Sequence, residues 1–198
     1  GTFLLCTFWL AEALARAGFR RVVINTAWQG QKLRTYVGDG RGRGLDIRYS
    51  DEGDHALETA GGIAHALPLL GPDPFAVING DVYTDYSFEQ LTLPTGRLAH
   101  LVLTDNPPQH PEGDFALDGG RVTSGTGARL TFAGIGVYRP ALFRGLPPRP
   151  LRLAPILKRA IAAGLVSGEH YRGVWHDIGT PERLRELDAR LQRPHPPR

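Results

Sequence analysis

Short apolar runs alternate with helical segments through the first half of this chain, and a glycine follows most of the helices. Arg20–Asn25 and Leu45–Ser50 have the pattern of strands, and helices are expected over Leu5–Ala17, Gln29–Val37 and Gly61–Leu70. Strands that alternate with helices through short connections predict a parallel sheet covered on both faces. The chain is therefore expected to have an α/β fold.

The second half of the chain is richer in strands. Leu98–Thr104 and Leu130–Tyr138 are predicted strands, and Gly134 and Gly136 inside the second one indicate close approach of a ligand or another backbone. Asp118-Gly119-Gly120 predicts a hairpin turn. The remaining expected elements are helices over Ser87–Leu93 and Pro155–Ala163, a last strand over Tyr171–Ile178, a helix capped by Thr180, and a disordered tail over Gln192–Arg198.

Two of the apolar runs end in an aspartate. The run that starts at Phe75 leads through Asn79 and Gly80 to Asp81, and the run that starts at Gly173 leads to Asp177. Ligands of open α/β sheets bind beyond the carboxyl ends of the strands, and Mg²⁺ favours a few carboxylates together with substrate phosphates. Asn-Gly-Asp alone is equally typical of a turn. The second strand-end aspartate favours a magnesium site in a phosphate-handling enzyme.

Small residues surround the start of a predicted helix at Leu57–Ile63. Such residues let backbone N–H groups approach an anion or a planar base. A plain helix start with Thr59 as the N-cap fits the same residues equally well. No Gly-Lys-Ser or Gly-Lys-Thr follows, so the segment is not a Walker-type phosphate loop.

Composition narrows the class of protein. The 198 residues suit one domain, expected over residues 1–191, and the formal charge of +3 comes from scattered arginines. That charge predicts no nucleic-acid partner and suits small anionic substrates. No apolar run reaches about 18 residues, so no membrane span is expected. The single cysteine, Cys6, excludes an intrachain disulfide and fits the reducing cytoplasm, and the seven histidines lack zinc spacing.

Several segments, taken together and in order, resemble sugar-1-phosphate nucleotidyltransferases. They are Leu57–Ile63, Val77–Asp81, Gly113–Phe115, Thr131–Ile135 and Trp175–Thr180, and the similarity covers nearly all of residues 1–191. Ile47–Ser50, Leu57–Thr59 and Ser167–Gly173 are similar to the members that make UDP-N-acetylmuramate in bacterial cell-wall recycling. The resemblance implies a Rossmann-like, three-layer α/β/α fold with a mixed, mostly parallel sheet.

The same resemblance implies a reaction and a set of site residues. The phosphate of N-acetylmuramate 1-phosphate would attack the α-phosphorus of UTP in line, and pyrophosphate would leave. Asp81 and Asp177 would hold Mg²⁺ and serve catalysis. The stretch from Glu52 to Gly62 would line the base. The residues implied for substrate binding are Glu52, Glu58, Thr59, Ala60, Gly61, Gly62, Asn79, Gly80 for the nucleotide, and Asp114, Gly134 and Glu169 for the sugar.

One departure from the family pattern concerns the beginning of the chain. The family opens with a strand, a Gly-rich loop that contains an arginine, and a Pro-Lys-Pro segment, all before the position that Gly1 matches. We therefore expect the first strand of the fold to be missing from between the strands that end at Asn25 and at Asp81. Losing even one preorganised electrostatic donor costs about 10²–10³ in rate, so the chain itself is expected to be inactive.

Two alternatives stay open at this point. Few contacts choose the base, so an enzyme similar to a mannose-1-phosphate guanylyltransferase fits nearly as well. A non-catalytic nucleotide- or sugar-binding module would explain the missing phosphate loop, whereas Asp81 and Asp177 argue against it. A dehydrogenase is disfavoured because no Gly-x-Gly-x-x-Gly follows the first strand. The sequence leaves the oligomeric state open.

Overall fold

The computed structural model describes residues 10–125, 127–147 and 149–192. In chain order its helices and strands are β1 (Arg21–Thr26), α2 (Gly30–Val37), β2 (Asp46–Asp51), α3 (Glu58–Leu70), β3 (Phe75–Ile78), β4 (Val82–Thr84), β5 (Ala99–Thr104), β6 (Phe115–Asp118), β7 (Arg121–Thr123), β8 (Arg129–Tyr138), α4 (Leu153–Ala162), β9 (Val166–Tyr171), β10 (Trp175–Asp177) and α5 (Pro181–Leu191). Residues 10–16 are also helical. In these ranges no helix is long and apolar enough to cross a membrane. Cys6 and residues 193–198 of the predicted tail lie outside the described residues.

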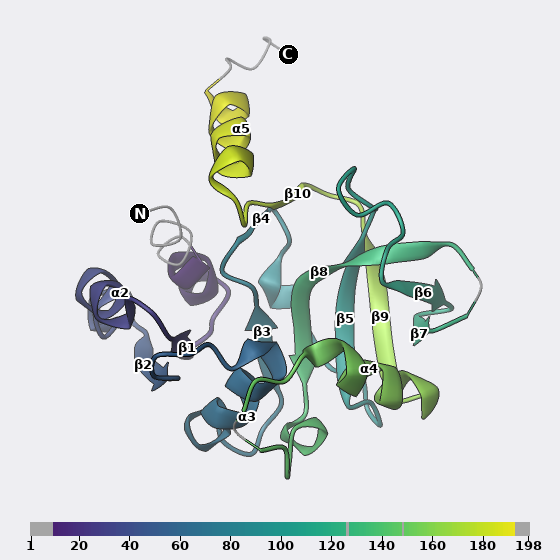
Figure 1. Cartoon of the computed structure of the whole chain (residues 1–198), viewed down its shortest axis with the longest axis horizontal. Helices are drawn as coiled ribbons and strands as arrows, with labels where there is room; N and C mark the ends of the chain where they lie inside the picture. Colours follow the sequence, from purple (N-terminus) through teal and green to yellow (C-terminus); the bar gives the residue numbers. More distant parts are fainter. Residues whose placement is uncertain (1–9, 126, 148, 193–198) are drawn as a thin grey trace.

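The main sheet has six strands in the order β3-β8-β5-β9-β7-β6 (Figure 1). β8 runs antiparallel to both β3 and β5, and β9 runs parallel to β5. The strands β3, β5 and β9 therefore share one direction, and their carboxyl ends meet at the same edge of the sheet. This edge is the place where an open α/β sheet binds its ligands.

The sheet is mixed, as expected, but the prediction that it is mostly parallel was wrong. Of the eight strand pairings among the described residues, only β1–β2 and β5–β9 are parallel. The physical reason is the position of β8, which lies between β3 and β5 and makes both of its pairings antiparallel. The hairpin of β6 and β7 adds further antiparallel pairs.

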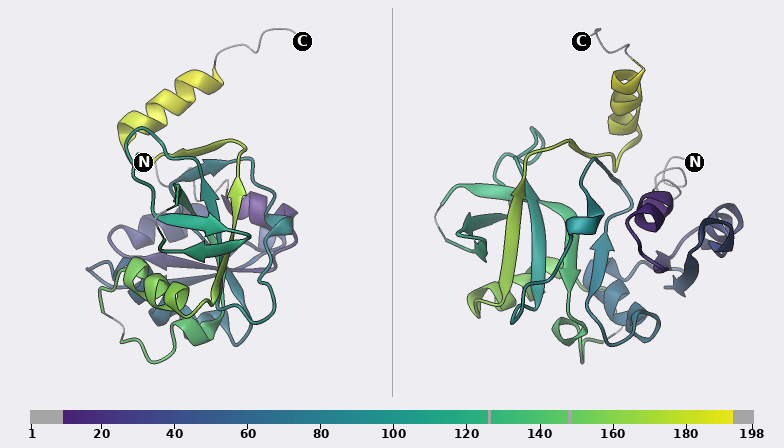
Figure 2. Two further views of the ribbon diagram at one scale, coloured as in Figure 1. Left: turned by 90° about the vertical axis from the view of Figure 1, so that its right-hand side faces the viewer. Right: turned by 180° about the vertical axis from the view of Figure 1, so that it is seen from behind.

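Two two-stranded sheets, β1 with β2 and β4 with β10, accompany the main one among the described residues. β1 pairs with β2 in parallel, and this pair lies with α2 beside the six-stranded sheet (Figures 1 and 2). A cavity of about 590 Å³ separates β1 from β3. Its walls are apolar, with Val22 and Ile24 on one side and Ala76 and Ile78 on the other. Among the described residues, the strand partner of β1 is β2 and that of β3 is β8.

Both faces of the main sheet are covered. Side chains alternate along β5, so Leu101 and Leu103 join the core formed with α3 and α4, while Val102 joins a second core on the opposite face. Leu14, from the helix at residues 10–16, and Ile135 of β8 belong to that second core. The layered arrangement matches the α/β/α fold that the resemblance implies.

Several local predictions are confirmed. Gly119 and Gly120 join β6 to β7, both with positive φ, as a two-residue hairpin turn requires. Thr180 is the N-cap of α5, and its hydroxyl oxygen accepts the backbone N–H of Arg183 at 3.3 Å. Pro181 occupies the first helical position, where its missing N–H costs nothing.

Three local predictions were wrong. The expected helix over Ser87–Leu93 is a single 3₁₀ turn, Phe88–Gln90, because Pro94 biases the residue before it toward extended backbone. The expected strand over Tyr171–Ile178 is shorter, because β10 covers Trp175–Asp177 and Tyr171 is the last residue of β9. The helix α3 begins at Glu58, so Thr59 lies inside it and does not cap it.

Candidate active site

Asp81 and Asp177 come together at the carboxyl edge of the sheet. The short strand β4 follows Asp81 and pairs antiparallel with β10, and this register places Asp177 opposite Val82. A methyl group added to Gly179 would lie 3.0 Å from one carboxylate oxygen of each aspartate. The two oxygens therefore lie at most twice that distance apart. The backbone N–H of Ile178 also donates to the carbonyl of Asp81 at 2.8 Å, which fixes the two segments together.

The two carboxylates have different surroundings. Burial raises the pKa of Asp81, and the neighbouring Asp177 raises it further, while Arg183 and the backbone of Asp81 itself act in the opposite direction. Asp177 is already engaged at both oxygens, because Oδ1 accepts the N–H of Gly179 at 2.8 Å and Oδ2 accepts Nη1 of Arg183 at 2.5 Å. A cation placed between the aspartates would relieve their repulsion.

The donor set fits a hard divalent cation that keeps other ligands. Among the residues that the structure describes, no group of three or more His, Cys, Asp or Glu side chains is arranged to hold a metal ion. Mg²⁺ is usually bound by one or two carboxylates and takes its remaining ligands from water and substrate phosphates. Asp81 and Asp177 supply this arrangement.

The cavity between β1 and β3 opens beside this pair. Six of the residues predicted to meet the nucleotide line it, namely Glu52, Glu58, Thr59, Gly62, Asn79 and Gly80. Ala60 and Gly61 do not line it. Both are buried, and their backbone N–H groups donate to the carbonyl of Leu151 at 2.9 and 3.3 Å. These two N–H groups are therefore engaged within the protein rather than turned toward a ligand.

Glu52 is held in a fixed position at the rim of the cavity. Its Oε1 accepts Nδ2 of Asn25 at 2.7 Å, and its Oε2 accepts the N–H of Leu57, also at 2.7 Å. Gly62 makes room for this arrangement, since a Cβ there would lie 2.5 Å from Oε1 of Glu52. Asn25 is a site residue that the sequence did not single out. Its position at the carboxyl end of a strand, like that of Asn79, was the available signal.

A bulge in β8 brings Asn79 and Gly134 together. Between Val102 and Leu103 of β5 the register of β8 shifts, which leaves Ala133 and Gly134 outside the regular pairing. Gly134 has φ +72°, and the N–H of Asn79 donates to its carbonyl at 2.8 Å. A Cβ at Gly134 would lie 2.8 Å from Nδ2 of Asn79. The glycine therefore permits the close backbone approach that the sequence predicted.

Asp114 and Glu169, predicted to meet the sugar, lie elsewhere along the same sheet. Asp114 precedes β6, and its Oδ2 accepts the N–H of Phe132 at 2.8 Å while His110 Nε2 lies 3.2 Å from its Oδ1. Glu169 lies on β9, opposite Val102 of β5. Among the described residues, neither carboxylate contacts the aspartate pair.

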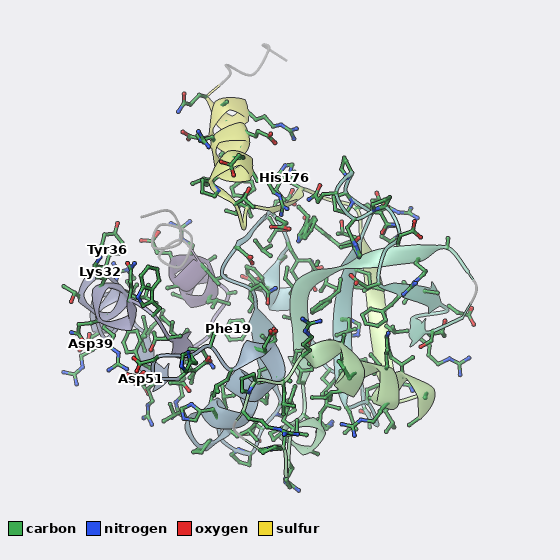
Figure 3. All side chains as sticks on the ribbon, in the orientation of Figure 1. Phe19, Lys32, Tyr36, Asp39, Asp51 and His176 are labelled. Atoms are coloured by element: carbon green, nitrogen blue, oxygen red, sulfur yellow. The ribbon has the colours of Figure 1, made fainter. Side chains whose placement is uncertain are left out.

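His176 lies on β10, close to the start of α5 (Figure 3). Its ring stacks on Tyr83, with ring centroids 6.2 Å apart. Burial lowers the pKa of His176. Alternation along β10 turns His176 away from the face that carries Asp177.

The arrangement can bind a cation and a phosphate together. Two carboxylates stand beside a cavity whose rim carries amides from Asn25 and Asn79 and the carboxylate of Glu52. A phosphate would bind at such a site by contacting the cation. No nucleophilic side chain is needed for this. This inventory suits group transfer by positioning and charge neutralisation.

No protein-family model matches the chain, but individual proteins do. An N-acetylmuramate α-1-phosphate uridylyltransferase of Neisseria meningitidis is 45% identical over 190 residues, which cover 91% of this chain and 82% of that protein. A protein of the same name from Caulobacter vibrioides is 29% identical and covers 92% of this chain and 82% of its own length. A mannose-1-phosphate guanylyltransferase catalytic subunit beta from Danio rerio is 28% identical over 86% of this chain and 51% of its own length.

Solved structures agree on the fold. The inositol-1-phosphate CTP transferase from T. maritima superposes with a TM-score of 0.75 at 15% identity, over 94% of this chain and 81% of its own. HddC from Yersinia pseudotuberculosis, complexed with GMP-PN, superposes with a TM-score of 0.74 at 17% identity, over 93% and 84% of the two chains. At these identities the likeness concerns the fold alone.

Proposed function

Because the chain belongs to the N-acetylmuramate α-1-phosphate uridylyltransferase family, we propose that its site transfers a uridylyl group from UTP to N-acetylmuramate 1-phosphate. The products are UDP-N-acetylmuramate and pyrophosphate. One observation carries the proposal, which is the convergence of Asp81 and Asp177 on Gly179 beside the cavity lined by Asn79 and Gly80. The domain that does this spans residues 1–191.

In the proposed complex Asp81 and Asp177 hold Mg²⁺. When bound, this cation neutralises phosphate charge and polarises the phosphorus that is attacked. Asn79 and Gly80 approach the phosphates from the end of β3. Glu52, Glu58, Thr59 and Gly62 line the base, because they form the opposite wall of the same cavity.

The sugar end of the substrate is assigned to Asp114, Gly134 and Glu169. The bulge at Gly134 ties this end to Asn79, so the two substrates would be positioned by one connected stretch of backbone. The attacking oxygen belongs to a phosphate that is ionised near neutral pH. The chain therefore supplies orientation and charge compensation, and needs no general base.

The substrates indicate the cellular compartment and the process to which the proposed reaction belongs. Nucleoside triphosphates are cytoplasmic metabolites, and the lone Cys6 suits the same reducing compartment. Reuse of N-acetylmuramate from the bacterial cell wall is the process in which the product would be consumed.

Guanylyl transfer to mannose 1-phosphate is the second candidate. The similarity to the guanylyltransferase subunit of Danio rerio favours it, at lower identity and over half of that protein's length. A purely binding role is the third candidate, and the approach of the Asp81 and Asp177 carboxylates to one another beside the cavity argues against it.

The proposal is tested by a thermal-shift panel of UTP, GTP, CTP and dTTP, each with Mg²⁺, followed by assays of pyrophosphate release from the stabilising nucleotide and a sugar 1-phosphate. We expect UTP to stabilise the chain most, and Asp81→Ala to abolish the Mg²⁺-dependent part of the shift. Stabilisation by GTP alone would overturn the uridylyl assignment.

Binding and turnover are separate readouts in this test. Binding of nucleotide without any pyrophosphate release would favour a binding module.

A further inference from the structure

The carboxylate of Glu169 is held from one side only. The hydroxyl of Tyr86 donates to Oε1 at 2.5 Å, and Nε2 of His100 lies 3.6 Å from the same oxygen. Among the described residues Oε2 has no hydrogen bond or ion pair, and the side chain is 42% exposed. One oxygen of this carboxylate is therefore fixed by the protein and the other is free to accept from a ligand.

Tyr86 is itself rigidly packed. Its side chain is buried and meets Phe88 and Tyr171 edge-on, with ring centroids 5.8 and 5.2 Å apart. The hydroxyl of Tyr171 in turn donates to Asp85. The phenol of Tyr86 therefore has little freedom to follow Glu169, and the carboxylate has to take the orientation that the phenol sets.

His100 is fixed in the same way from the other side. Its Nδ1 lies 2.9 Å from Oγ of Ser167, and the parallel register of β5 and β9 places these two residues opposite one another. Its ring is 13% exposed. The pair supports the carboxylate from the strand next to β9.

The protonation states agree with this arrangement. Burial and the bond to Glu169 both raise the pKa of Tyr86, so its hydroxyl keeps its proton and acts as the donor. Burial lowers the pKa of His100 against the pull of Glu169, which keeps the imidazole neutral near pH 7. A neutral His100 does not compensate the negative charge of Glu169, so this charge can attract a hydrogen-bond donor of the ligand. The phenol of Tyr86 donates to a carboxylate, and such a hydrogen bond is strong.

We propose that Tyr86, supported by His100, is a positioning residue that turns Glu169 so that its free Oε2 accepts a hydrogen bond from the sugar of the sugar 1-phosphate. This inference rests on the proposed function and on the assignment of Glu169 to the sugar. Tyr86 acts through Glu169 and does not touch the nucleotide.

The test measures two affinities on the same protein. Isothermal titration calorimetry gives the Kd of UTP with Mg²⁺, and then the Kd of N-acetylmuramate 1-phosphate in the presence of a non-hydrolysable UTP analogue. For Tyr86→Phe we expect the Kd of the sugar phosphate to rise about tenfold and that of UTP to change by less than about twofold. A merely structural role would weaken both alike, and that result would overturn the proposal.

A double-mutant cycle shows whether Tyr86 works through Glu169. In a Glu169→Ala background, Tyr86→Phe is expected to cause no further loss of sugar-phosphate affinity. An equal loss with and without Glu169 contradicts the proposal. Tyr138→Phe is the matched control, because it also removes a buried phenol hydroxyl but lies in the core, and it should leave both affinities unchanged.

The experiment distinguishes failure of the positioning role from failure of the proposed function. Should Tyr86→Phe fail to fold, His100→Gln tests the same support and is expected to raise the Kd of the sugar phosphate alone, by a smaller factor; a Kd that stays unchanged counts against the proposal. If the wild-type chain binds neither UTP nor the sugar phosphate, the proposed function fails. If it binds both and Tyr86→Phe changes neither affinity, only the positioning role fails.

Discussion

The phenol of Tyr138 lies at the end of β8 in the middle of the main core. The residue is fully buried, and among the described residues its hydroxyl has no hydrogen-bond partner. An unsatisfied buried donor costs about 1–3 kcal/mol. We therefore expect Tyr138→Phe to raise the free energy of unfolding by roughly 1 kcal/mol, measured by urea denaturation with an unchanged m-value. A lower stability would mean that the hydroxyl has a partner after all.

Asp81 carries a stability cost linked to its charge. Burial raises its pKa, so the folded state binds the proton more tightly than the unfolded chain, whose ordinary value is 3.8. Below pH 3.8 the carboxyl of Asp81 is protonated in both states, so its charge costs no stability there. The loss of stability grows as the pH rises through the pKa of Asp81 in the folded state. We expect Asp81→Asn to raise the thermal midpoint at pH 7 without metal, and to give no gain near pH 3.

The control for this change is Asp118→Asn in the hairpin, where the carboxylate is 79% exposed. It removes the same charge and should leave the midpoint unchanged. An equal gain from Asp81→Asn at pH 3 and pH 7 would show that burial of the charge is not the cause.

Arg183 competes with any cation for Asp177. Its Nη1 lies 2.5 Å from Oδ2, and each side chain of the pair is 34% exposed. Partly exposed pairs contribute about 0.2–1 kcal/mol, so Arg183→Gln should tighten Mn²⁺ binding by up to about fivefold, as measured by the loss of the free-ion electron paramagnetic resonance signal. Arg185→Gln, which breaks an exposed pair with Glu182, should leave Mn²⁺ binding unchanged. Weaker binding after Arg183→Gln would show that the guanidinium supports the site.

At the scale of elements, the bulge of β8 shapes the site. Gly134 combines a positive φ with contact to Asn79, whereas Gly119 in the hairpin has φ +53° and open space around it. Left-handed backbone costs a non-glycine residue about 1–2 kcal/mol at either position. Gly134→Ala should destabilise the protein by clearly more than Gly119→Ala in chemical denaturation, because only the former forces Asn79 to move. Equal losses would mean that the contact with Asn79 carries no energy.

The elements also show what the sequence could reveal. The strand β5 and the helices α2 and α4 were predictable because apolar residues recur with the period of each element. The strand β9 was missed because its stretch from Ser167 to His170 is polar, and the structure shows these side chains facing a hydrogen-bonded network rather than a core. A strand that carries polar site residues lacks the apolar pattern by which strands are recognised in a sequence.

The site itself was predictable in part for the same reason. Asp81 and Asp177 could be found since each ends an apolar run of the sequence, whereas the antiparallel pairing of β4 with β10 that joins them had no signal there. Tyr86 and His100 could not, because their role depends on a loop packing across β5 and β9. A role of Ala60 and Gly61 at the nucleotide stays a prediction, and only the fold reveals that the carbonyl of Leu151 accepts their N–H groups.

For the whole molecule, the six-stranded sheet and the sheet of β1 and β2 should differ in local stability. β5 and β8 lie inside the six-stranded ladder, whereas β1 has a single strand partner among the described residues. We expect amide hydrogens of β5 and β8 to exchange at least tenfold more slowly than those of β1. UTP with Mg²⁺ should slow exchange in β1 and β2 selectively. Uniform exchange rates across both sheets would contradict this picture.

The cavity lies between two parts of the candidate site that belong to different sheets. Asn25 and Glu52 belong to the small sheet, while Asp81 belongs to the large one, and side-chain packing rather than a strand ladder sets the spacing between them among the described residues. Packing of this kind adjusts by small displacements more readily than paired strands do. Under the proposed function, changes in the small sheet can therefore alter which nucleobase is accepted while the carboxylates assigned to the metal stay where they are.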